Sequence, residues 1–178
     1  MTMKRVDAQT EMPPAVPVAE LNLAGDLGKQ VKFNLATDED TTDLAQLRNG
    51  SEPWKGRGEA LEESQASIGQ LRPFTHVARV NQQIVGYVTV ERDGPVAGAA
   101  YMRNIVVRED LRRRGLGSLL LDHAMEQARE MIRKTIALRV DPANAAAVNF
   151  YRARGFTTVA TVVSKKSGKL RLLMSREL

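Results

Sequence analysis

Apolar residues recur along this chain with two different spacings, and each spacing predicts a different element. Ile136, Leu138 and Val140 stand at every second position, as expected for a strand that buries one face. After Leu116, apolar side chains recur every three or four residues as far as Ile132, which predicts an amphipathic helix. The same criteria predict strands at 31–35, 74–80, 84–92, 97–107, 135–141, 156–163 and 169–176. They predict helices at 37–49, 59–71, 116–132 and 144–153.

Turn-forming residues punctuate this pattern. Asn81-Gln82-Gln83 lies between two strand segments and predicts a hairpin. Gly86 falls inside a strand, which predicts a bulge or a close backbone approach. Gly155 follows the last helix, where a left-handed cap favours glycine. The resulting order is β-α-α-β-β-β-α-β-α-β-β, an α/β fold whose central sheet is mostly antiparallel.

The chain length and the distribution of prolines suggest one domain with an N-terminal extension. The 178 residues fit a single domain, which is expected over residues 31–178. Residues 1–30 contain Pro13, Pro14 and Pro17 and little periodicity, so we expect an extension that is flexible or contacts a partner subunit. Within it, the stretch 16–23 is a candidate edge strand or subunit contact.

Composition excludes several classes of protein. A hydrophobic share of 43% and a charged share of 26% are typical of a globular domain. Because there is no cysteine, thiolate metal sites and a thiol nucleophile are excluded. The two histidines have no metal-ligand spacing, so no metal is expected. There is no apolar run long enough for a membrane span and no signal-peptide pattern, so the expected location is the cytoplasm, without a membrane partner.

A basic, glycine-containing turn connects the strand that ends at Val107 to the long helix. Helix-initial N–H groups lack intrahelical partners, and glycines at 115 and 117 let a phosphate approach them. The three arginines 112–114 add positive charge, and the whole chain carries a formal net charge of +5. A phosphate or pyrophosphate is therefore the expected ligand. The turn lacks the P-loop sequence, and Leu120 stands where a dinucleotide fingerprint needs glycine or alanine.

The turn resembles a signature of the GNAT superfamily of acyl-CoA-dependent N-acyltransferases, Arg/Gln-x-x-Gly-x-Gly/Ala, here Arg112-x-x-Gly115-x-Gly117. A second motif of that family, Asn-x-x-Ala-x-x-x-Tyr-x-x-x-Gly-Phe, is matched from Asn144 to Phe156. Asn144 and Tyr151 are seven residues apart, so one helix face carries both. The resemblance covers residues 31–178.

The resemblance implies a reaction and roles for individual residues. The reaction is direct transfer of the acetyl group of acetyl-CoA to a primary amine. Tyr151 would protonate the departing thiolate, and backbone amides of the strand ending at Val107 would bind the pantetheine arm and polarise the thioester. The resemblance assigns cofactor binding to Ile105, Val106, Val107, Arg112, Arg113, Arg114, Gly115, Leu116, Gly117, Ser118, Asn144 and Tyr151. The sheet is expected to splay beside this strand to admit the pantetheine.

The base that receives the proton of the amine is less evident. Related ribosomal-protein N-terminal acetyltransferases carry an acidic residue where this chain has Arg139, which argues against that route here. Glu91 is the best remaining candidate; its alternative role is an exposed residue at a strand end. An amine that arrives neutral needs no protein base.

The acceptor is predicted to be a small metabolite. Arg103 and Arg139 are expected near the thioester, which favours a carboxylate-bearing amine, while a protein lysine or N-terminus is the alternative. Trp54, Lys55 and Arg57 are expected to border the acceptor pocket, unless Trp54 simply packs on the core. A non-catalytic acyl-CoA-binding module is a second alternative. Nucleic acid is not an expected partner, because few aromatic residues lie among the basic ones. The family resemblance is compatible with a homodimer.

Overall fold

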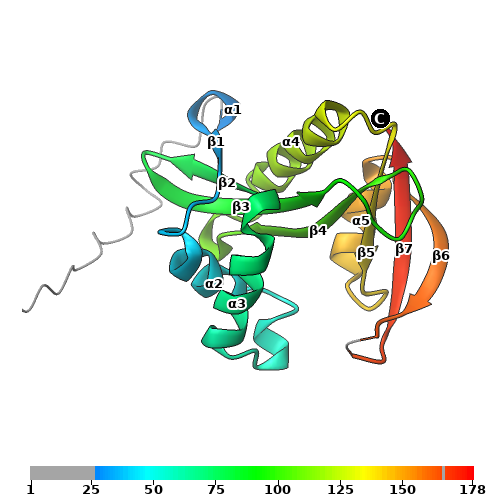
Figure 1. Ribbon diagram of the computed structural model, residues 1–178, viewed down its shortest axis with the longest axis horizontal. Helices are drawn as coiled ribbons and strands as arrows, with labels where there is room; N and C mark the ends of the chain where they lie inside the picture. Colours follow the sequence, from blue (N-terminus) through cyan, green and yellow to red (C-terminus); the bar gives the residue numbers. More distant parts are fainter. Residues whose placement is uncertain (1–26, 166) are drawn as a thin grey trace, which may run out of the picture.

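Seven strands form one mixed sheet in the computed structural model, which describes residues 27–165 and 167–178 (Figure 1). The strands are β1 Lys32–Leu35, β2 Thr75–Val80, β3 Gln83–Glu91, β4 Ala100–Val107, β5 Thr135–Val140, β6 Thr157–Val163 and β7 Leu170–Glu177. Their order across the sheet is β1-β2-β3-β4-β5-β7-β6. All neighbours are antiparallel except β4 and β5. The predicted α/β, mostly antiparallel fold is therefore confirmed.

Helices cover both faces of this sheet. They are α1 Leu27–Gln30, α2 Thr41–Asn49, α3 Leu61–Leu71, α4 Leu116–Glu130 and α5 Ala145–Ala153. Short 3-10 turns at Lys55–Arg57, Arg72–Phe74 and Glu109–Leu111 join the elements. Figure 1 shows α4 on one face of β2, β3 and β4 and α2 with α3 on the other. The strands and longer helices thus follow one another along the chain in the predicted order.

Some predicted boundaries and burials differ from those observed. The fourth strand begins at Ala100 instead of residue 97, because residues 96–99 form a turn in which Gly98 has a left-handed backbone. Strand β5 was expected to bury one face only. Ala137 on its other face is buried as well, and Arg139 is the exposed residue of the strand. The predicted stretch 16–23 lies outside the described residues, and the last four residues of the predicted extension form α1.

The hairpin between β2 and β3 confirms the predicted turn. Asn81 and Gln82 both have positive φ, 47° and 68°, which is the two-residue turn that matches the twist of paired strands. The β2–β3 register shifts beside Gly86, so Val85 is an extra residue in β3. A Cβ atom at Gly86 would lie 2.6 Å from the carbonyl oxygen of Val106. Both predicted reasons for glycine here, a bulge and a close backbone approach, are present.

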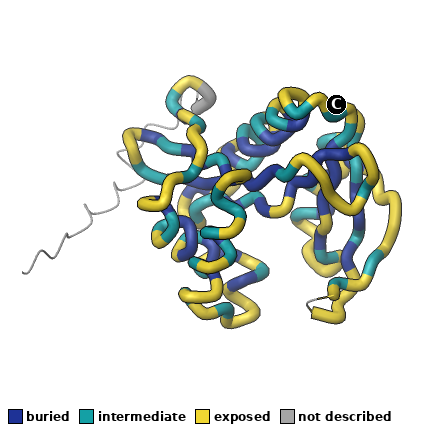
Figure 2. The backbone as a smooth tube through the Cα atoms, viewed as in Figure 1, coloured by how far each residue is buried: buried dark blue, intermediate teal, exposed yellow. Residues whose placement is uncertain are grey.

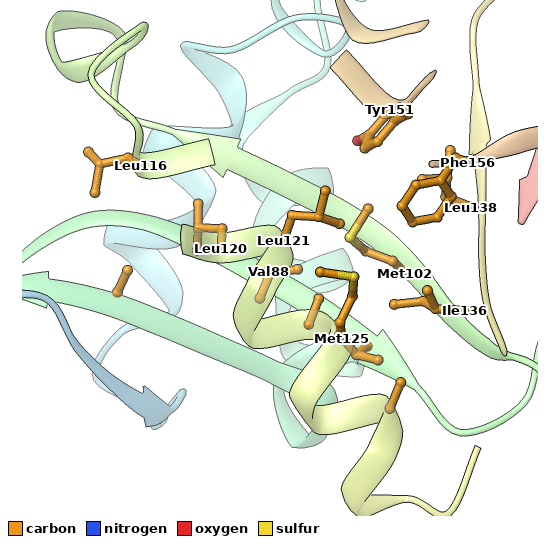
Figure 3. Packing of buried hydrophobic residues seen from close by; sticks show 14 of the residues in the cluster. Val88, Met102, Leu116, Leu120, Leu121, Met125, Ile136, Leu138, Tyr151 and Phe156 are labelled. Carbon is orange, nitrogen blue, oxygen red and sulfur yellow. The ribbon is translucent and has the colours of Figure 1, made fainter. Parts of the chain in front are cut away.

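The larger core lies between α4 and the sheet. Figure 3 shows Leu121 and Met125 of α4 packing toward Val88 and Met102 of the sheet. The cluster continues through Ile136, Leu138 and Phe156 as far as Tyr151. A smaller cluster on the other face contains Leu44, Ala45, Trp54, Ile68, Val77, Tyr87 and Val106. In Figure 2 the buried positions follow the sheet, whereas β6 at its outer edge is exposed. Because the larger cluster includes residues of α5 and β5, it packs both elements against the rest of the sheet.

The two histidines, which are distant in sequence, meet between β2 and α4. His123 Nε2 lies 3.0 Å from His76 Nδ1, and the ring of Phe33 stacks on His123 with centroids 4.0 Å apart. Burial, and then the neighbouring His76, lower the pKa of His123 to about 4. Burial also lowers the pKa of His76, against the opposing effect of Glu130. Both rings are therefore neutral at pH 7, and one donates a hydrogen bond to the other.

This pair predicts a loss of stability in acid. In the unfolded chain His123 regains a pKa near 6.5, so between that pH and about 4 the unfolded state binds more protons than the folded state. The free energy of unfolding should fall as the pH drops through this window, by roughly 1 kcal/mol, a value reduced because both rings are partly exposed. Urea unfolding at about pH 7 and about pH 5 measures it. A His123→Gln variant with the same pH dependence would contradict the assignment.

Candidate active site at the opening between strands β4 and β5

The two central parallel strands pair over a short length and then separate. Residues 100–102 of β4 pair with residues 136–138 of β5, and the ladder ends there. In the β3–β4 ladder, Thr89 pairs with Asn104 and Val90 with Met102, so Arg103 is an extra, bulged residue. Beyond the bulge, one edge of β4 has no strand partner beside Ile105 to Val107. The predicted splay of the sheet is confirmed.

A cavity of about 640 Å³ lies beside this open edge of β4. Its lining residues come from the loop after α2, from β4, from the start of α4 and from α5; they are Ser51, Glu52, Ile105, Val106, Val107, Arg112, Arg113, Gly115, Gly117, Ser118, Asn144, Ala147, Phe150 and Tyr151. All predicted cofactor-binding residues line it except Arg114 and Leu116. Arg114 is exposed elsewhere on the turn, and the Leu116 side chain is buried in the core.

The start of α4 lines this first cavity, the donor cavity, with groups that suit an anion. Gly115 caps the helix with φ at 90°, and Arg113 before it also has a left-handed backbone, with φ at 60°. This turn presents the first N–H groups of a fifteen-residue helix to the cavity. A Cβ atom at Gly117 would have the Phe150 ring as its nearest neighbour, at 3.8 Å, so the helix surface there is open. N–H donors, a helix N-terminus and two arginines fit a pyrophosphate.

Two arginines tie the donor cavity to neighbouring elements. Arg112 donates to Ser51 Oγ over 3.2 Å and to the Val107 carbonyl over 3.4 Å, which fixes the loop after α2 to the basic turn. Arg154 donates to Ser118 Oγ and lies over the Phe150 ring, 5.3 Å from its centroid. The sequence reasoning missed Phe150 and Arg154. Their signal was helical spacing, because residues 147, 150, 151 and 154 share one face of α5.

A second cavity of about 690 Å³, hereafter the acceptor-side cavity, lies on the other side of the opening. It is bordered by the loop after α2, by β4 and β5, and by residues at the β6–β7 turn. The two cavities share a wall made of Glu52, Ile105, Asn144, Ala147 and Tyr151. Two compartments that meet at a few side chains are suited to a reaction between two bound molecules.

Tyr151 and Asn144 stand on the shared wall, on one face of α5 as predicted. The Tyr151 ring packs edge-on to Phe156 with centroids 5.7 Å apart and leaves the residue 7% exposed (Figure 3). Burial raises the pKa of the Tyr151 phenol, so it stays protonated and remains a donor. Asn144 caps α5, since its Oδ1 accepts the Ala147 N–H over 3.1 Å. That bond orients its side-chain amide at the junction of the cavities.

Trp54 fulfils both roles that were considered for it. It belongs to the smaller core cluster and is 9% exposed, yet it also lines the acceptor-side cavity. The guanidinium of Arg48 lies 4.5 Å from the centroid of the indole and covers part of its face. Trp54 therefore forms a rigid wall of this cavity.

Glu91, the predicted base, does not lie at the site where the reaction is expected. Glu91 lines neither cavity, and its Oε2 accepts a hydrogen bond from Arg103 Nε over 2.6 Å. The carboxylate that does line both cavities is Glu52, which accepts the Gly56 N–H over 3.1 Å. Glu52 could not be identified from sequence patterns, because its position depends on the fold of the loop around Pro53.

We therefore predict that Glu91→Gln changes the catalytic rate little. The substitution keeps the shape of the side chain and removes a charge that lies outside both cavities, so kcat/KM should fall by less than about tenfold. Steady-state kinetics over a range of pH provide the measurement. A loss near that of a general base, roughly 100-fold or more, with a shifted pH profile would restore Glu91 as the base.

Among the described residues, no helix is long and apolar enough to cross a bilayer. The same part of the chain contains no group of three or more His, Asp or Glu side chains that would bind a metal ion.

Comparisons with known proteins identify the family of this chain. The model of the acetyltransferase (GNAT) family matches residues 41–156. The curated [ribosomal protein bS18]-alanine N-acetyltransferase of Salmonella typhimurium is 39% identical over 61 residues, which is 34% of this chain and 41% of that protein. The chain thus matches less than half of that relative's length.

Solved structures share the fold. Ard1 from Thermoplasma volcanium has a TM-score of 0.68 at 20% identity, covering 84% of this chain and 98% of its own. The structure of yncA from Salmonella typhimurium, solved with its cofactor acetyl-CoA, has a TM-score of 0.63 at 17% identity and covers 84% of this chain and 94% of its own. At these identities the likeness is one of fold.

Proposed function

We propose that this chain, which belongs to the acetyltransferase (GNAT) family, is an acetyl-CoA-dependent N-acetyltransferase that acetylates the primary amine of a small metabolite. The observation that carries the proposal is the pair of cavities that share one wall. The donor cavity suits the acetyl-CoA, and the acceptor-side cavity suits the amine. With the two substrates bound in this way, Tyr151 on the shared wall lies beside the thioester.

We propose that the donor cavity holds acetyl-CoA in two parts. The N–H groups at the start of α4, with Arg112 and Arg113, bind the pyrophosphate. The open edge of β4 at Ile105 to Val107 binds the pantetheine arm as an added strand would, through backbone hydrogen bonds. One of these amides polarises the thioester carbonyl, where negative charge develops during the reaction. The arginine at position 154 adds charge through its contact with Ser118.

The chemistry requires few groups from the protein. The neutral amine nitrogen bonds to the thioester carbon, the C–S bond breaks, and the sulfur departs as a thiolate. Tyr151 donates its phenolic proton to that thiolate. The nitrogen releases a proton as the amide forms, and this proton restores the Tyr151 phenol. Glu91 is not required as the base for this step, in keeping with the ion pair that engages it.

A protein acceptor is the second candidate function. The specific observation in its favour is the curated relative, whose name states that it acetylates the alanine of ribosomal protein bS18. Against it stands Arg139, at the position where the resemblance to ribosomal-protein N-terminal acetyltransferases implies an acidic residue. A cytoplasmic location and a homodimer remain predictions from the sequence.

The proposal is tested by incubating the full chain with acetyl-CoA and a panel of amines, with a peptide that begins with alanine beside them. The release of the CoA thiol and the mass of the acetylated product are measured. We expect amine-dependent thiol release with at least one small amine. Thiol release with the peptide alone would move the function to protein N-terminal acetylation, and release with no amine at all would contradict catalysis.

A further inference from the structure

The charged residues that line the acceptor-side cavity are unevenly distributed. The wall that it shares with the donor cavity contains a single charged residue, the acid Glu52. The remainder of its lining contains four arginines, at 57, 103, 139 and 171, and one acid, Asp141. The shared wall is thus negative, and the rest of the lining carries a net positive charge.

Two of the four arginines already have carboxylate partners. Arg103 bonds Glu91 over 2.6 Å, and Arg171 bonds Asp141 over 3.0 Å. Arg57 and Arg139 form no ion pair with a carboxylate among the described residues. Arg139 is exposed, and its guanidinium lies over the Tyr101 ring, 5.9 Å from the centroid. This ring contact and the side-chain hydrogen bond between Arg139 and Tyr101 orient the guanidinium, whose five N–H donors exceed that one bond and can also bind an anion.

Asn104 provides an independent sign of a ligand in the same cavity. The residue is 7% exposed, lies on β4 directly after the bulge, and lines the acceptor-side cavity. Its side-chain Nδ2 is buried without a hydrogen-bond partner in the described structure. A buried donor without a partner costs free energy, so such groups commonly mark a place where a ligand supplies the acceptor.

We propose that the acceptor is a small zwitterionic amine, a molecule that carries a carboxylate besides its amino group. The carboxylate binds Arg139 and Arg57, with Asn104 Nδ2 as a further donor. The ammonium group binds Glu52 at the shared wall, beside Tyr151. This inference rests on the proposed acetyl transfer and names the substrate class of the same site.

Glu52 then also has a place in the proton balance. An ammonium cannot attack the thioester until it loses a proton, and Glu52 is the carboxylate on the shared wall that can pass this proton to solvent. The loss leaves the neutral amine whose nitrogen bonds to the carbonyl carbon. A polyamine would place its second cation against Arg57 and Arg139, and like charges there disfavour it.

The test compares matched acceptors. The standard L-amino acids, β-alanine and γ-aminobutyrate are each assayed beside the amine that lacks the carboxylate, with a C-terminally amidated peptide as a third type. For the best pair we expect kcat/KM to favour the carboxylate-bearing member by roughly 10- to 100-fold, the range of a charged hydrogen bond. A preference for the decarboxylated amine or for the peptide would overturn the inference while leaving acetyl transfer intact. No transfer to any acceptor would overturn both.

Substitutions of single arginines distinguish a role in acceptor recognition from a role in folding. Arg139→Gln should remove most of the preference by lowering kcat/KM for the carboxylate-bearing acceptor, with kcat/KM for its decarboxylated partner and the KM of acetyl-CoA unchanged. Its loss should exceed that of Arg103→Gln, whose guanidinium is already paired with Glu91. Arg152→Gln, an exposed arginine of α5 outside both cavities, is the charge-matched control. An equal loss for both acceptors in Arg139→Gln would point to a structural role and overturn the assignment.

Glu52→Gln tests the shared wall of the cavity. Because the ammonium group is common to both members of a pair, kcat/KM should fall to a similar extent for each, with a changed dependence on pH. Unchanged kinetics and pH profile would overturn the role of Glu52.

Discussion

Replacing Gly117 with glutamate is expected to abolish acetyl-CoA binding while leaving the fold intact. The new carboxylate would lie in the first turn of α4, where it repels the pyrophosphate. At a separation of about 4 Å and an effective dielectric constant near 20, each pair of like charges costs about 4 kcal/mol before screening, enough for more than a 100-fold rise in Kd. Titration calorimetry with acetyl-CoA measures the effect.

The same substitution should not harm the folded protein, which makes the result informative. A Cβ atom at Gly117 meets only the Phe150 ring, at an ordinary contact distance of 3.8 Å. An acid in the first turn of a helix is favourable, by about 0.3–1 kcal/mol. Gly117→Gln has nearly the same size without the charge and should retain much more affinity. If the glutamate variant bound acetyl-CoA within threefold of the wild type, the pyrophosphate would lie elsewhere.

Tyr151→Phe is expected to lower kcat by roughly 100-fold or more and leave acetyl-CoA affinity nearly unchanged, as for the loss of a general acid. The variant keeps the ring that packs against Phe156 and Phe150. Burial raises the pKa of this phenol, so the enzyme holds it protonated until the thiolate forms. Pre-steady-state kinetics and equilibrium binding separate the two effects.

A second donor distinguishes the acid role from a positioning role. An acetyl thioester of a more acidic thiol needs less help from an acid when the C–S bond breaks. The deficit of Tyr151→Phe should shrink with that donor, relative to wild type assayed with the same compound. An equal deficit with both donors would show that the hydroxyl acts in some other way.

The parts of the site that the sequence predicted are local along the chain. The turn from Arg112 to Ser118 and the helix face with Asn144 and Tyr151 each lie within one short segment, so spacing alone indicated their geometry. The resemblance names Leu116 for its backbone N–H, and this does not conflict with the helical periodicity that directs its side chain into the core. The bulge and the close backbone approach at Gly86 were also predicted from a local pattern, because an interior glycine in a strand has few explanations.

The acceptor-side cavity could be predicted only in part, because it gathers residues from distant segments. Trp54, Arg57, Arg103 and Arg139 were expected at the acceptor and line this cavity. Glu52 and Asn104 were not expected, since their positions depend on the fold of a loop and on the register of the sheet. The ion pair between Glu91 and Arg103 crosses two strands and was equally invisible. Charges that look alike in sequence are thus sorted into paired and free by the tertiary structure.

We claim that the opening between β4 and β5 binds acetyl-CoA, and thermal unfolding of the full chain with and without acetyl-CoA is the measurement that checks it. At a ligand concentration about 100 times the Kd, a one-site ligand stabilises the folded state by roughly 2.7 kcal/mol. For a chain of this size we expect Tm to rise by about 5–10 °C, and the rise should be lost in Gly117→Glu. An unchanged Tm of the wild type at saturating acetyl-CoA would contradict the claim.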